Sequence, residues 1–279
     1  MAAGMADEAD LIRASTTPLT KVKITAELTR MGLAHGDLVL MHTSMSALGW
    51  IPGGAQSVLE AVLEVLGPNG TLVCPGFSSQ LSDPAQWSSP PVPAEWVGQV
   101  QENMPVFHPD RTPTRNMGKV AEALRALPQT QRSHHPVDSF LAHGPMARAL
   151  LADHPIGHSL GQGSPLGKLY QHGAKVLLLG ANFGSCTAFH LAEDGLTGMP
   201  EISERYPHKR EGGKTLWQEV AQPPTFEAHF PNLGAAYEIA STRLTHGFTQ
   251  SARLFPLREA VDFARLWLQD AADQGRLSG

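Results

Sequence analysis

Apolar residues occur along the chain in short runs separated by helical repeats, which is typical of alternating strands and helices. Residues 38–44 start as an apolar run and end in polar side chains, and residues 71–75 form a second apolar run. Between them, residues 56–66 repeat apolar side chains at helical spacing, and Gly67 ends the repeat. A strand, a helix and a strand in this order predict a crossover unit, and therefore two parallel strands in one sheet.

The same alternation continues to the end of the chain. The pattern predicts one α/β domain over residues 1–279, folded as a three-layer sandwich around a central, mostly parallel sheet. The remaining predicted elements are helices at residues 19–33, 116–127, 145–152, 233–243 and 256–271, an extended segment at 133–142, and strands at 175–180 and 247–254.

Two long stretches have no sustained period. Residues 76–115 are rich in Ser, Pro, Trp and Gly, and residues 201–231 are irregular except for one expected strand at 215–220. Loops of this length inside a compact domain are usually functional. We expect both stretches to be insertions that border the substrate site.

Composition narrows the function. The chain has 279 residues, 42% of them hydrophobic and 17% charged, and a net charge of −5, which suits a globular protein. No basic run is present to neutralise phosphates, so we expect no nucleic-acid partner, whereas a cationic substrate is compatible with the charge. The first residues lack the blocks of a signal peptide and no apolar run is long enough for a bilayer. We therefore expect a cytoplasmic location and no membrane partner.

The segment from residue 175 to residue 193 places a histidine and a carboxylate after a buried strand. A turn follows the strand, and Ser185 is expected to cap the next helix. His190 and Glu193 are three residues apart and share one face of that helix. The pair is a candidate proton-transfer site, because ligands of α/β sheets bind at the carboxyl ends of strands. The same spacing also fits a core histidine beside a surface glutamate.

A second strand also ends in polar residues. His42, Thr43 and Ser44 come directly after an apolar run, and the Gly53-Gly54 pair then leads into a helix. Free backbone N–H groups and the helix dipole at such a point suit an anion, such as the pyrophosphate of a coenzyme. The phosphate-loop pattern GxxxxGK[ST] is absent, so this is not a P-loop.

The segment RSHHPVDSFLAHG offers further polar contacts. Arg132 and Ser133 are natural partners for a phosphate or an amide. The adjacent His134-His135 pair suggests a metal, but HExxH is absent and no known ligand spacing is completed nearby. We therefore expect no metal. The neighbouring residues considered for this role are Asp138, His154 and His158.

Taken together, the phrases GDLVLMHTSM, RSHHPVDSFLAHG, SPLGKLY and KVLLLGANFGSCTAFHLAE resemble the aminoglycoside 3-N-acetyltransferase family, which is not of the GNAT type. The resemblance extends from Ile24 to Phe255. It implies an α/β sandwich, acetyl-coenzyme A as the donor, and acetylation of the 3-amino group of a deoxystreptamine ring. The implied partners are coenzyme A and an aminoglycoside or another polycationic amine. The sequence does not determine the number of subunits, and a homodimer is among the assemblies consistent with it.

The resemblance also implies roles for individual residues. His190 matches the general base of the family, and Glu193 the acid beside it. His42 precedes Thr43 and Ser44 at the strand tip and is expected to touch the thioester region. Backbone N–H groups near Thr43 and Ser44 are expected to stabilise the oxyanion. With the glycine pair, the residues expected to bind the coenzyme are His42, Thr43, Ser44, Gly53, Gly54, Phe77, Ser78, Arg132, Ser133 and Phe140.

One departure from the family concerns the acid that orients the histidine. The family carries a run of acids where this chain has EVAQPPTFEAHF, so that only Glu219 and Glu227 are available. Gln222 or Pro224 stands where a carboxylate is expected. We assign Glu219 as the third catalytic residue on this basis.

The expected chemistry is direct transfer without a covalent intermediate. An amine attacks a thioester only when it is unprotonated, and a histidine with a pKa of about 6.5 is a suitable base. A polycationic substrate needs carboxylates, and those in or beside the irregular stretches are Asp83, Asp194, Glu201 and Glu204.

Three alternatives remain open. A hydrolase could combine Ser44 or Ser185 with His190, although the GxSxG elbow is missing. The chain could instead be a non-catalytic relative that binds coenzyme A or a cationic sugar. A third alternative is an acetyltransferase for another metabolic amine.

Overall fold

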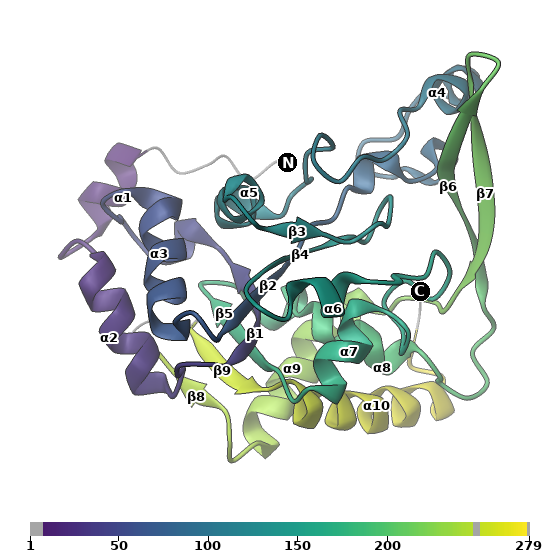
Figure 1. Cartoon of the computed structure of the whole chain (residues 1–279). Helices are drawn as coiled ribbons and strands as arrows, with labels where there is room; N and C mark the ends of the chain where they lie inside the picture. Colours follow the sequence, from purple (N-terminus) through teal and green to yellow (C-terminus); the bar gives the residue numbers. More distant parts are fainter. Residues whose placement is uncertain (1–7, 248–251, 278–279) are drawn as a thin grey trace.

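Three parallel strands form the centre of the molecule. The computed structural model describes residues 8–247 and 252–277. Strand β1 (Leu38–Thr43) pairs in parallel with β2 (Thr71–Pro75) on one side and with β5 (Lys175–Leu179) on the other (Figure 1). The predicted crossover unit and its parallel pair are therefore confirmed.

The outer strands complete a sheet of seven. Strand β4 (Phe140–His143) runs antiparallel to β2 and is followed at the edge by β3 (Gln131–Arg132). On the other side, β9 (Arg253–Pro256) runs antiparallel to β5, and β8 (Thr245–His246) forms the second edge. In the order β3-β4-β2-β1-β5-β9-β8, all strands except β4 and β9 point the same way, so the mostly parallel sheet is confirmed.

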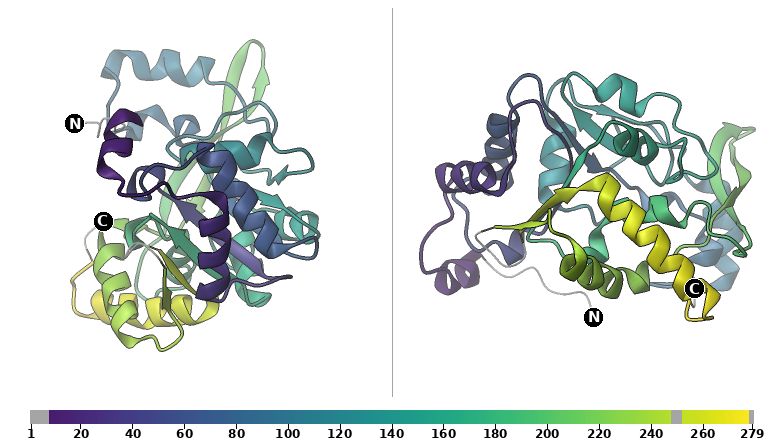
Figure 2. Two further views of the ribbon diagram at one scale, coloured as in Figure 1. Left: turned by 90° about the vertical axis from the view of Figure 1, so that its left-hand side faces the viewer. Right: turned by 90° about the horizontal axis from the view of Figure 1, so that it is seen from below.

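Helices cover both faces of this sheet because successive strand residues point to opposite sides. Val39 and Met41 pack into one hydrophobic cluster, whereas Leu38 and Leu40 pack into another. Figures 1 and 2 show the resulting three layers. The first cluster contains residues of α2 (Lys21–Met31), α3 (Gly54–Leu66) and α5 (Gly118–Ala126), and the second contains residues of α6 (Ala147–Leu151), α7 (Pro165–Gln171), α9 (Phe230–Ala240) and α10 (Leu257–Asp273).

The C-terminal elements differ from their predicted bounds. The helix expected at 233–243 is α9 and begins three residues earlier, because Pro231 suits the first turn of a helix. The strand expected at 247–254 starts at Arg253 as β9, and residues 248–251 lie outside the described residues. The longest helix, α10, has 17 residues. Across the described ranges, no helix is both long and apolar enough to cross a membrane.

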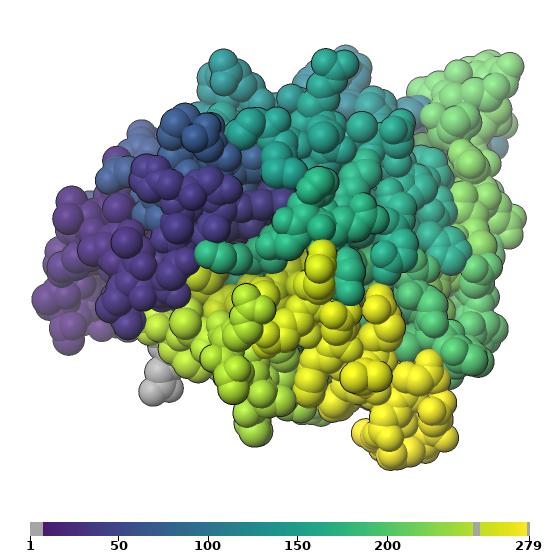
Figure 3. Space-filling model, turned by 60° about the horizontal axis from the view of Figure 1, so that its bottom comes forward, coloured from purple at the N-terminus to yellow at the C-terminus, as the bar shows by residue number. Residues whose placement is uncertain are grey.

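The prediction that residues 201–231 are mainly irregular is wrong. They contain a two-stranded hairpin of β6 (Ile202–Glu211) and β7 (Lys214–Gln222), which forms a sheet of its own. Most residues of β6 are exposed, so the strand lacks the apolar alternation that marks a half-buried strand. In Figure 3 the light green hairpin stands at the edge of the molecule, away from the purple N-terminal helices.

The first insertion supports this hairpin. Residues 76–115 contain helix α4 (Val97–Asn103) and three short 3₁₀ turns. The indole N–H of Trp217 on β7 donates to the carbonyl of Gln101 at 3.0 Å, and Trp217 packs against a small apolar cluster of Leu81, Met104 and Phe107. The two insertions therefore contact each other and form one wall beside the main sheet.

Candidate active site

The chain after β5 turns sharply before it reaches the histidine. The prediction that Ser185 caps a continuous helix is wrong: two 3₁₀ turns, Phe183–Ser185 and Thr187–Phe189, precede the short helix α8 (His190–Glu193). The N-cap residues of these three elements are Asn182, Cys186 and Phe189, and none of them makes a side-chain capping hydrogen bond. These turns carry the imidazole of His190 back over the end of the sheet.

Two carboxylates hold the imidazole of His190. Its Nδ1 lies 2.7 Å from Oε2 of Glu193, as the spacing of the two residues predicts. Its Nε2 lies 3.2 Å from Oε1 of Glu227, on the turn before α9. The other oxygen of Glu193 accepts the backbone N–H of Phe226 at 2.6 Å, and the ring of Phe230 packs against the imidazole. His190 and Glu193 are buried, whereas Glu227 is largely exposed.

The two carboxylates determine the charge of His190. Burial lowers the pKa of His190, but the charges and hydrogen bonds of Glu193 and Glu227 outweigh burial and raise the pKa to about 10. The hydrogen bond to His190 in turn lowers the pKa of Glu227. At neutral pH the free protein therefore holds an imidazolium between two carboxylates. His190 can accept a proton only after it has lost its own.

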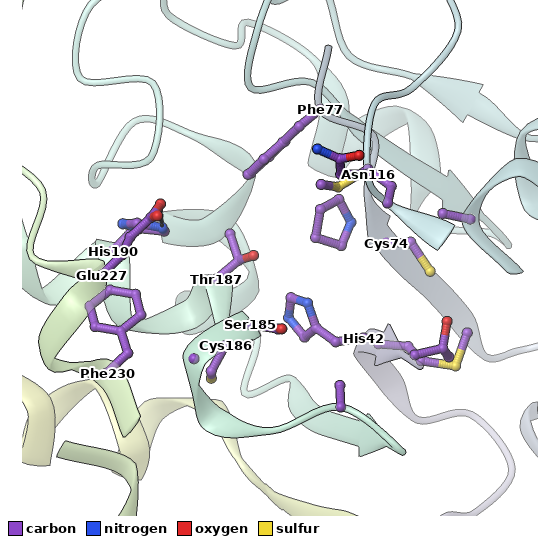
Figure 4. A pocket seen from close by; sticks show the side chains of 17 residues that line it. His42, Cys74, Phe77, Asn116, Ser185, Cys186, Thr187, His190, Glu227 and Phe230 are labelled. Atoms are coloured by element: carbon purple, nitrogen blue, oxygen red, sulfur yellow. Dashed lines mark ion pairs between the residues drawn. The ribbon is translucent and has the colours of Figure 1, made fainter. Parts of the chain in front are cut away.

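Two cavities meet at His190. The first, the strand-end cavity, has a volume of about 210 Å³ and lies beyond the ends of β1 and β2 (Figure 4). The second, the hairpin cavity, has a volume of about 260 Å³ and lies between the first insertion and the β6–β7 hairpin. Phe77, His190 and Glu227 line both cavities. Two ligands could thus reach the same imidazole from different sides.

The strand-end cavity combines apolar and polar groups. Of the residues predicted to bind a coenzyme, His42, Thr43 and Phe77 line it, and the structure adds Asn116 and Thr187, which sequence reasoning missed. Figure 4 shows His42, Phe77, Asn116 and Thr187 around one space, together with His190; His42 belongs to β1 and His190 to α8. The cysteines of this cavity are poor nucleophiles, because burial raises the pKa of each to about 12; they are Cys74 and Cys186.

The hairpin cavity is acidic. Of the residues predicted to bind a cation, Asp83 and Glu204 line it. Asp138 also lines it and accepts the hydroxyl of Ser159 at 2.5 Å. Burial raises the pKa of Asp138 and that of Glu204. Asp138 was considered only as a metal ligand from the sequence, because nothing local shows that it faces the same space as the hairpin.

One cation is already present among these acids. Arg205 on β6 lines the hairpin cavity, and its Nη1 lies 3.4 Å from Oδ2 of Asp83. Asp83 is buried and also accepts the side-chain amide of Gln101 at 2.7 Å and the N–H of Ala85 at 3.0 Å. The guanidinium lies over the ring of Trp217. Arg205 therefore neutralises part of the negative charge with which the acids of the cavity could bind a ligand.

The structure does not bring three of the predicted acids to His190. Glu219 lies on β7, accepts the hydroxyl of Ser203 at 2.5 Å, and lines neither cavity. The position beside His190 that was predicted for Glu219 is taken by Glu227. Asp194 and Glu201 each lie 2.8 Å from His158, likewise outside both cavities. Glu219 is separated from His190 because it lies within the hairpin, opposite Arg205, and not at the end of the main sheet.

Gln222, at the end of β7, does line the hairpin cavity. Its amide donates to the hydroxyls of Tyr206 at 3.0 Å and Ser159 at 3.2 Å, and its carbonyl accepts the N–H of Ser159. Gln222, one of the two residues considered for the position of the expected carboxylate, thus joins the hairpin to the main domain.

Several predicted coenzyme contacts have partners within the protein. Arg132 donates to Gly76, Ser78 and Ser139, and so holds the start of the first insertion. The N–H of Ser44 donates to the carbonyl of Leu179 at 3.0 Å, so it is not free for an oxyanion. The predicted coenzyme residues that line neither cavity are Ser44, Gly53, Gly54, Ser78, Arg132, Ser133 and Phe140.

The histidine pair at 134–135 does not gather metal ligands. The ring of His135 is buried, with Nε2 3.1 Å from the carbonyl of Ile156 and Nδ1 accepting the N–H of Asp138. Over the part of the chain that the structure describes, no three His, Cys, Asp or Glu side chains form a group that could hold a metal.

Comparison with known proteins gives one consistent family. The model of the family described as Aminoglycoside 3-N-acetyltransferase matches residues 40–269. The chain is 43% identical over 260 residues to the SPbeta prophage-derived aminoglycoside N(3')-acetyltransferase-like protein YokD of Bacillus subtilis (strain 168), covering 92% of this chain and 95% of that protein. The crystal structure of YokD superposes with a TM-score of 0.90 at 41% identity, covering 95% of this chain and 99% of that chain.

Two further relatives agree. Aminoglycoside N(3)-acetyltransferase VII of Streptomyces paromomycinus is 32% identical over 295 residues, which cover 98% of this chain and 99% of that protein. The structure of AAC-IIIb in a binary complex with CoASH superposes with a TM-score of 0.76 at 30% identity, covering 91% of this chain and 97% of that chain. The resemblance carried by the sequence motifs is confirmed, and the chain belongs to the aminoglycoside 3-N-acetyltransferase family, whose members are transferases.

Proposed function

We propose that this protein transfers the acetyl group of acetyl-coenzyme A to the 3-amino group of the deoxystreptamine ring of aminoglycosides. One observation carries the proposal: His190 lies where the strand-end cavity and the acidic hairpin cavity meet. Such a junction lets an acyl donor and a cationic acceptor approach the same imidazole from opposite sides. The family and the CoASH complex of a relative support the choice of donor and acceptor.

The strand-end cavity fits the thioester end of the donor. Phe77 and Met117 offer apolar contacts to a pantetheine arm, and the side chains of Asn116 and Thr187 offer polar contacts to its amides. The buried Nε2 of His42 has no hydrogen-bond partner within the protein, as expected of a group that meets a ligand. Acetyl-coenzyme A supplies the activated acetyl group.

The hairpin cavity fits the amine. Among the described residues, no lysine or arginine pairs with Asp138 or Glu204, so both can receive the ammonium groups of the acceptor. Nδ1 of His135 lies 3.8 Å from Oδ2 of Asp138, but it accepts a backbone N–H. The other acids of the cavity are already paired: Asp83 with Arg205, and Glu193 and Glu227 with His190. Asp194 and Glu201 contact the substrate in this proposal only if it extends beyond the cavity, since both lie around His158.

His190 acts as the general base in this mechanism. A cationic amine entering the hairpin cavity adds a like charge beside the imidazolium and so lowers the pKa of His190, which releases the proton of Nε2 to solvent. Nε2 then takes a proton from the attacking amine, while Glu193 holds the proton on Nδ1 and stabilises the imidazolium that forms. A nitrogen–carbon bond forms, the carbon–sulfur bond breaks, and the thiolate leaves with its electron pair and takes the proton that His190 accepted. The acetyl group passes directly to the amine.

The geometry does not favour a serine hydrolase. Both ring nitrogens of His190 lie against carboxylates, and Ser44 lines neither cavity. Ser185 lines the strand-end cavity, but no hydrogen bond joins it to His190 among the described contacts.

The proposal is tested by following thiol release from acetyl-coenzyme A with a panel of aminoglycosides and simple metabolic amines, and by locating the acetyl group in the product by NMR. We expect turnover with aminoglycosides and acetylation at the 3-amino position. Intersecting double-reciprocal lines are expected for a ternary complex, whereas parallel lines would indicate a covalent intermediate. Coenzyme binding without thiol release from any amine would support a non-catalytic relative instead.

Replacing Glu227 with glutamine should shift the pH dependence of the reaction. Glu227 helps to raise the pKa of His190 to about 10, so its neutralisation lowers that pKa. The unprotonated base then appears at lower pH, and the rising limb of the kcat/KM profile moves toward lower pH. The comparison is made between wild-type protein and Glu227→Gln with the same amine, so that ionisation of the substrate cancels.

Glu211→Gln is the matched control, because Glu211 is exposed on the hairpin and pairs with Lys209. Its profile should coincide with that of the wild type. A limb that stays in place in Glu227→Gln would show that His190 does not set the pH dependence.

Replacing Arg205 with glutamine should improve the binding of highly charged acceptors. The change frees Asp83 to pair with a substrate ammonium, so KM for an acceptor with four or five amines should fall. One partly exposed ion pair contributes roughly 1 kcal/mol or less, so we expect a decrease of up to about fivefold. KM for 2-deoxystreptamine, which has only two amines, should change less, and the gain should diminish with added salt.

Arg210→Gln tests whether loss of any hairpin cation has this effect, because Arg210 lies on β6 near Thr215 and outside the cavity. An equal decrease in KM for both arginine variants would attribute the effect to net charge and not to the cavity.

A further inference from the structure

We propose that Nε2 of His42 donates a hydrogen bond to the carbonyl oxygen of the acetyl thioester and stabilises the oxyanion that forms there. The inference rests on the proposed function and assigns a second histidine to the same reaction. His42 lies near the end of β1, opposite Leu178 of β5, and is 8% exposed. Its ring lines the strand-end cavity (Figure 4).

The main observation is a buried ring nitrogen of His42 that has no hydrogen-bond partner. Among the described residues, only three buried side-chain nitrogen or oxygen atoms lack a hydrogen-bond partner, and Nε2 of His42 is one of them. Buried polar groups are nearly always paired, because leaving one unpaired is costly. The Nε2 atoms of the other buried histidines all have partners: those of His135 and His154 contact backbone carbonyls, and that of His190 contacts Glu227. His42 differs from them because its partner is not supplied by the protein.

The position of His42 indicates that it contacts the acyl donor and not the amine. His190 lines both cavities, whereas His42 lines the strand-end cavity and not the hairpin cavity. A ligand atom that meets His42 therefore belongs to the donor and not to the amine. The backbone N–H of Ser44, which the sequence offered for the oxyanion, is already bonded to Leu179. An oxyanion formed in this cavity thus needs another donor.

The protonation state of the His42 ring suits a hydrogen-bond donor. Burial and the charge of His190 lower the pKa of His42 to about 3, so the ring is neutral at the pH of the reaction. A neutral imidazole polarises a carbonyl through its N–H without giving up the proton.

The electron balance assigns separate roles to the two histidines. The amine nitrogen attacks the carbonyl carbon, and the electron pair of the carbon–oxygen π bond moves to the oxygen that Nε2–H of His42 faces. The carbonyl reforms as the carbon–sulfur bond breaks and the thiolate leaves. The proton of the amine goes to His190, and His42 neither gains nor loses a proton.

The test compares His42→Phe, which keeps a ring without a donor, with His42→Gln, which keeps an N–H donor. We expect kcat of His42→Phe to fall by about 10²–10³-fold, the usual effect of removing one oxyanion donor, with little change in KM for acetyl-coenzyme A. The loss in His42→Gln should be smaller. His143→Phe is the control, since His143 lies on β4 and lines neither cavity.

A spectroscopic measurement separates this role from a structural one. A ketone analogue of acetyl-coenzyme A with a ¹³C-labelled carbonyl is bound to each variant, and the infrared carbonyl band is recorded. The band should lie at lower frequency in wild-type protein and His143→Phe than in His42→Phe. Melting temperatures identify any variant that has not folded, and the band of the wild-type complex against the free analogue remains informative in that case.

Three results would overturn the inference. The first is a wild-type kcat in His42→Phe, and the second is a raised KM with kcat unchanged, which would indicate ground-state binding only. The third is a carbonyl band that does not differ between wild-type complex and free analogue. Absence of turnover in the wild-type protein would instead refute the proposed function, and the band shift would still test the contact with His42.

Discussion

Replacing His190 with asparagine is expected to lower kcat by about 10²–10⁴-fold at neutral pH, the range found for loss of a general base. The variant should keep its affinity for acetyl-coenzyme A, because the donor contacts many other residues of the strand-end cavity. Without the base, only amine that is already unprotonated can react, so the remaining rate should increase with pH in proportion to free amine. Thiol release measured over a range of pH checks both expectations.

His172→Asn is the matched control, since His172 is exposed at the end of α7 and lines neither cavity. It should have the activity of the wild type. Turnover close to that of the parent in His190→Asn, with normal folding, would remove His190 from the mechanism.

The second large effect is expected at Glu193. Glu193→Gln keeps the shape of the side chain but removes the charge that faces Nδ1 of His190 at 2.7 Å. In the wild-type protein the second carboxylate oxygen accepts the N–H of Phe226. Glutamine has only one side-chain oxygen and cannot accept from both groups in the same way. We expect kcat to fall by about 10²–10⁴-fold, because the imidazolium formed in the reaction loses its stabilising partner.

The same change should destabilise the fold. Removing one partner of a buried ion pair typically costs about 3–5 kcal/mol, and both side chains of this pair are almost fully buried. The free energy of unfolding in denaturant is compared for Glu193→Gln and Glu227→Gln. Only Glu193→Gln should lose stability, because Glu227 is largely exposed. An active Glu193→Gln with wild-type stability would contradict the assignment of Glu193 as the residue that orients His190.

The contact between His190 and Glu193 could be predicted from the sequence because its geometry is local. His190 and Glu193 are separated by one helical turn, and that spacing alone brings the side chains together. The central strands were equally accessible, since each is a short apolar run that ends in glycine or polar residues. Both predictions depend only on periodicity, which the sequence displays directly.

The second carboxylate on His190 could not be identified in this way. Glu227 and Glu219 both follow the family motif in the chain, and neither lies near His190 in sequence. The choice between them depends on the β6–β7 hairpin, whose exposed strands give no apolar alternation. Once the hairpin forms, Glu219 lies along its length and Glu227 comes back to the end of the sheet.

Seven of the ten residues predicted to contact the coenzyme lie outside both cavities for a related reason. The residue type of Arg132 suggests a phosphate, but the neighbours that satisfy it come from the first insertion, which has no recognisable period. Ser44 has a suitable position at a strand end, yet its N–H extends the pairing of β1 with β5. Whether a polar group is free for a ligand is decided by tertiary partners that local patterns do not reveal.

The attachment of the β6–β7 hairpin has a consequence for how this protein could evolve. One side of the hairpin cavity is carried by a sheet that shares no strand with the central one, and its anchors include Trp217 with its small apolar cluster and the hydrogen bonds of Gln222. Mutations in the hairpin can therefore alter the lining of this cavity while the packing of the central sheet stays intact. Under the proposed function, exchange of hairpins between homologues offers a direct route to a changed range of acceptors.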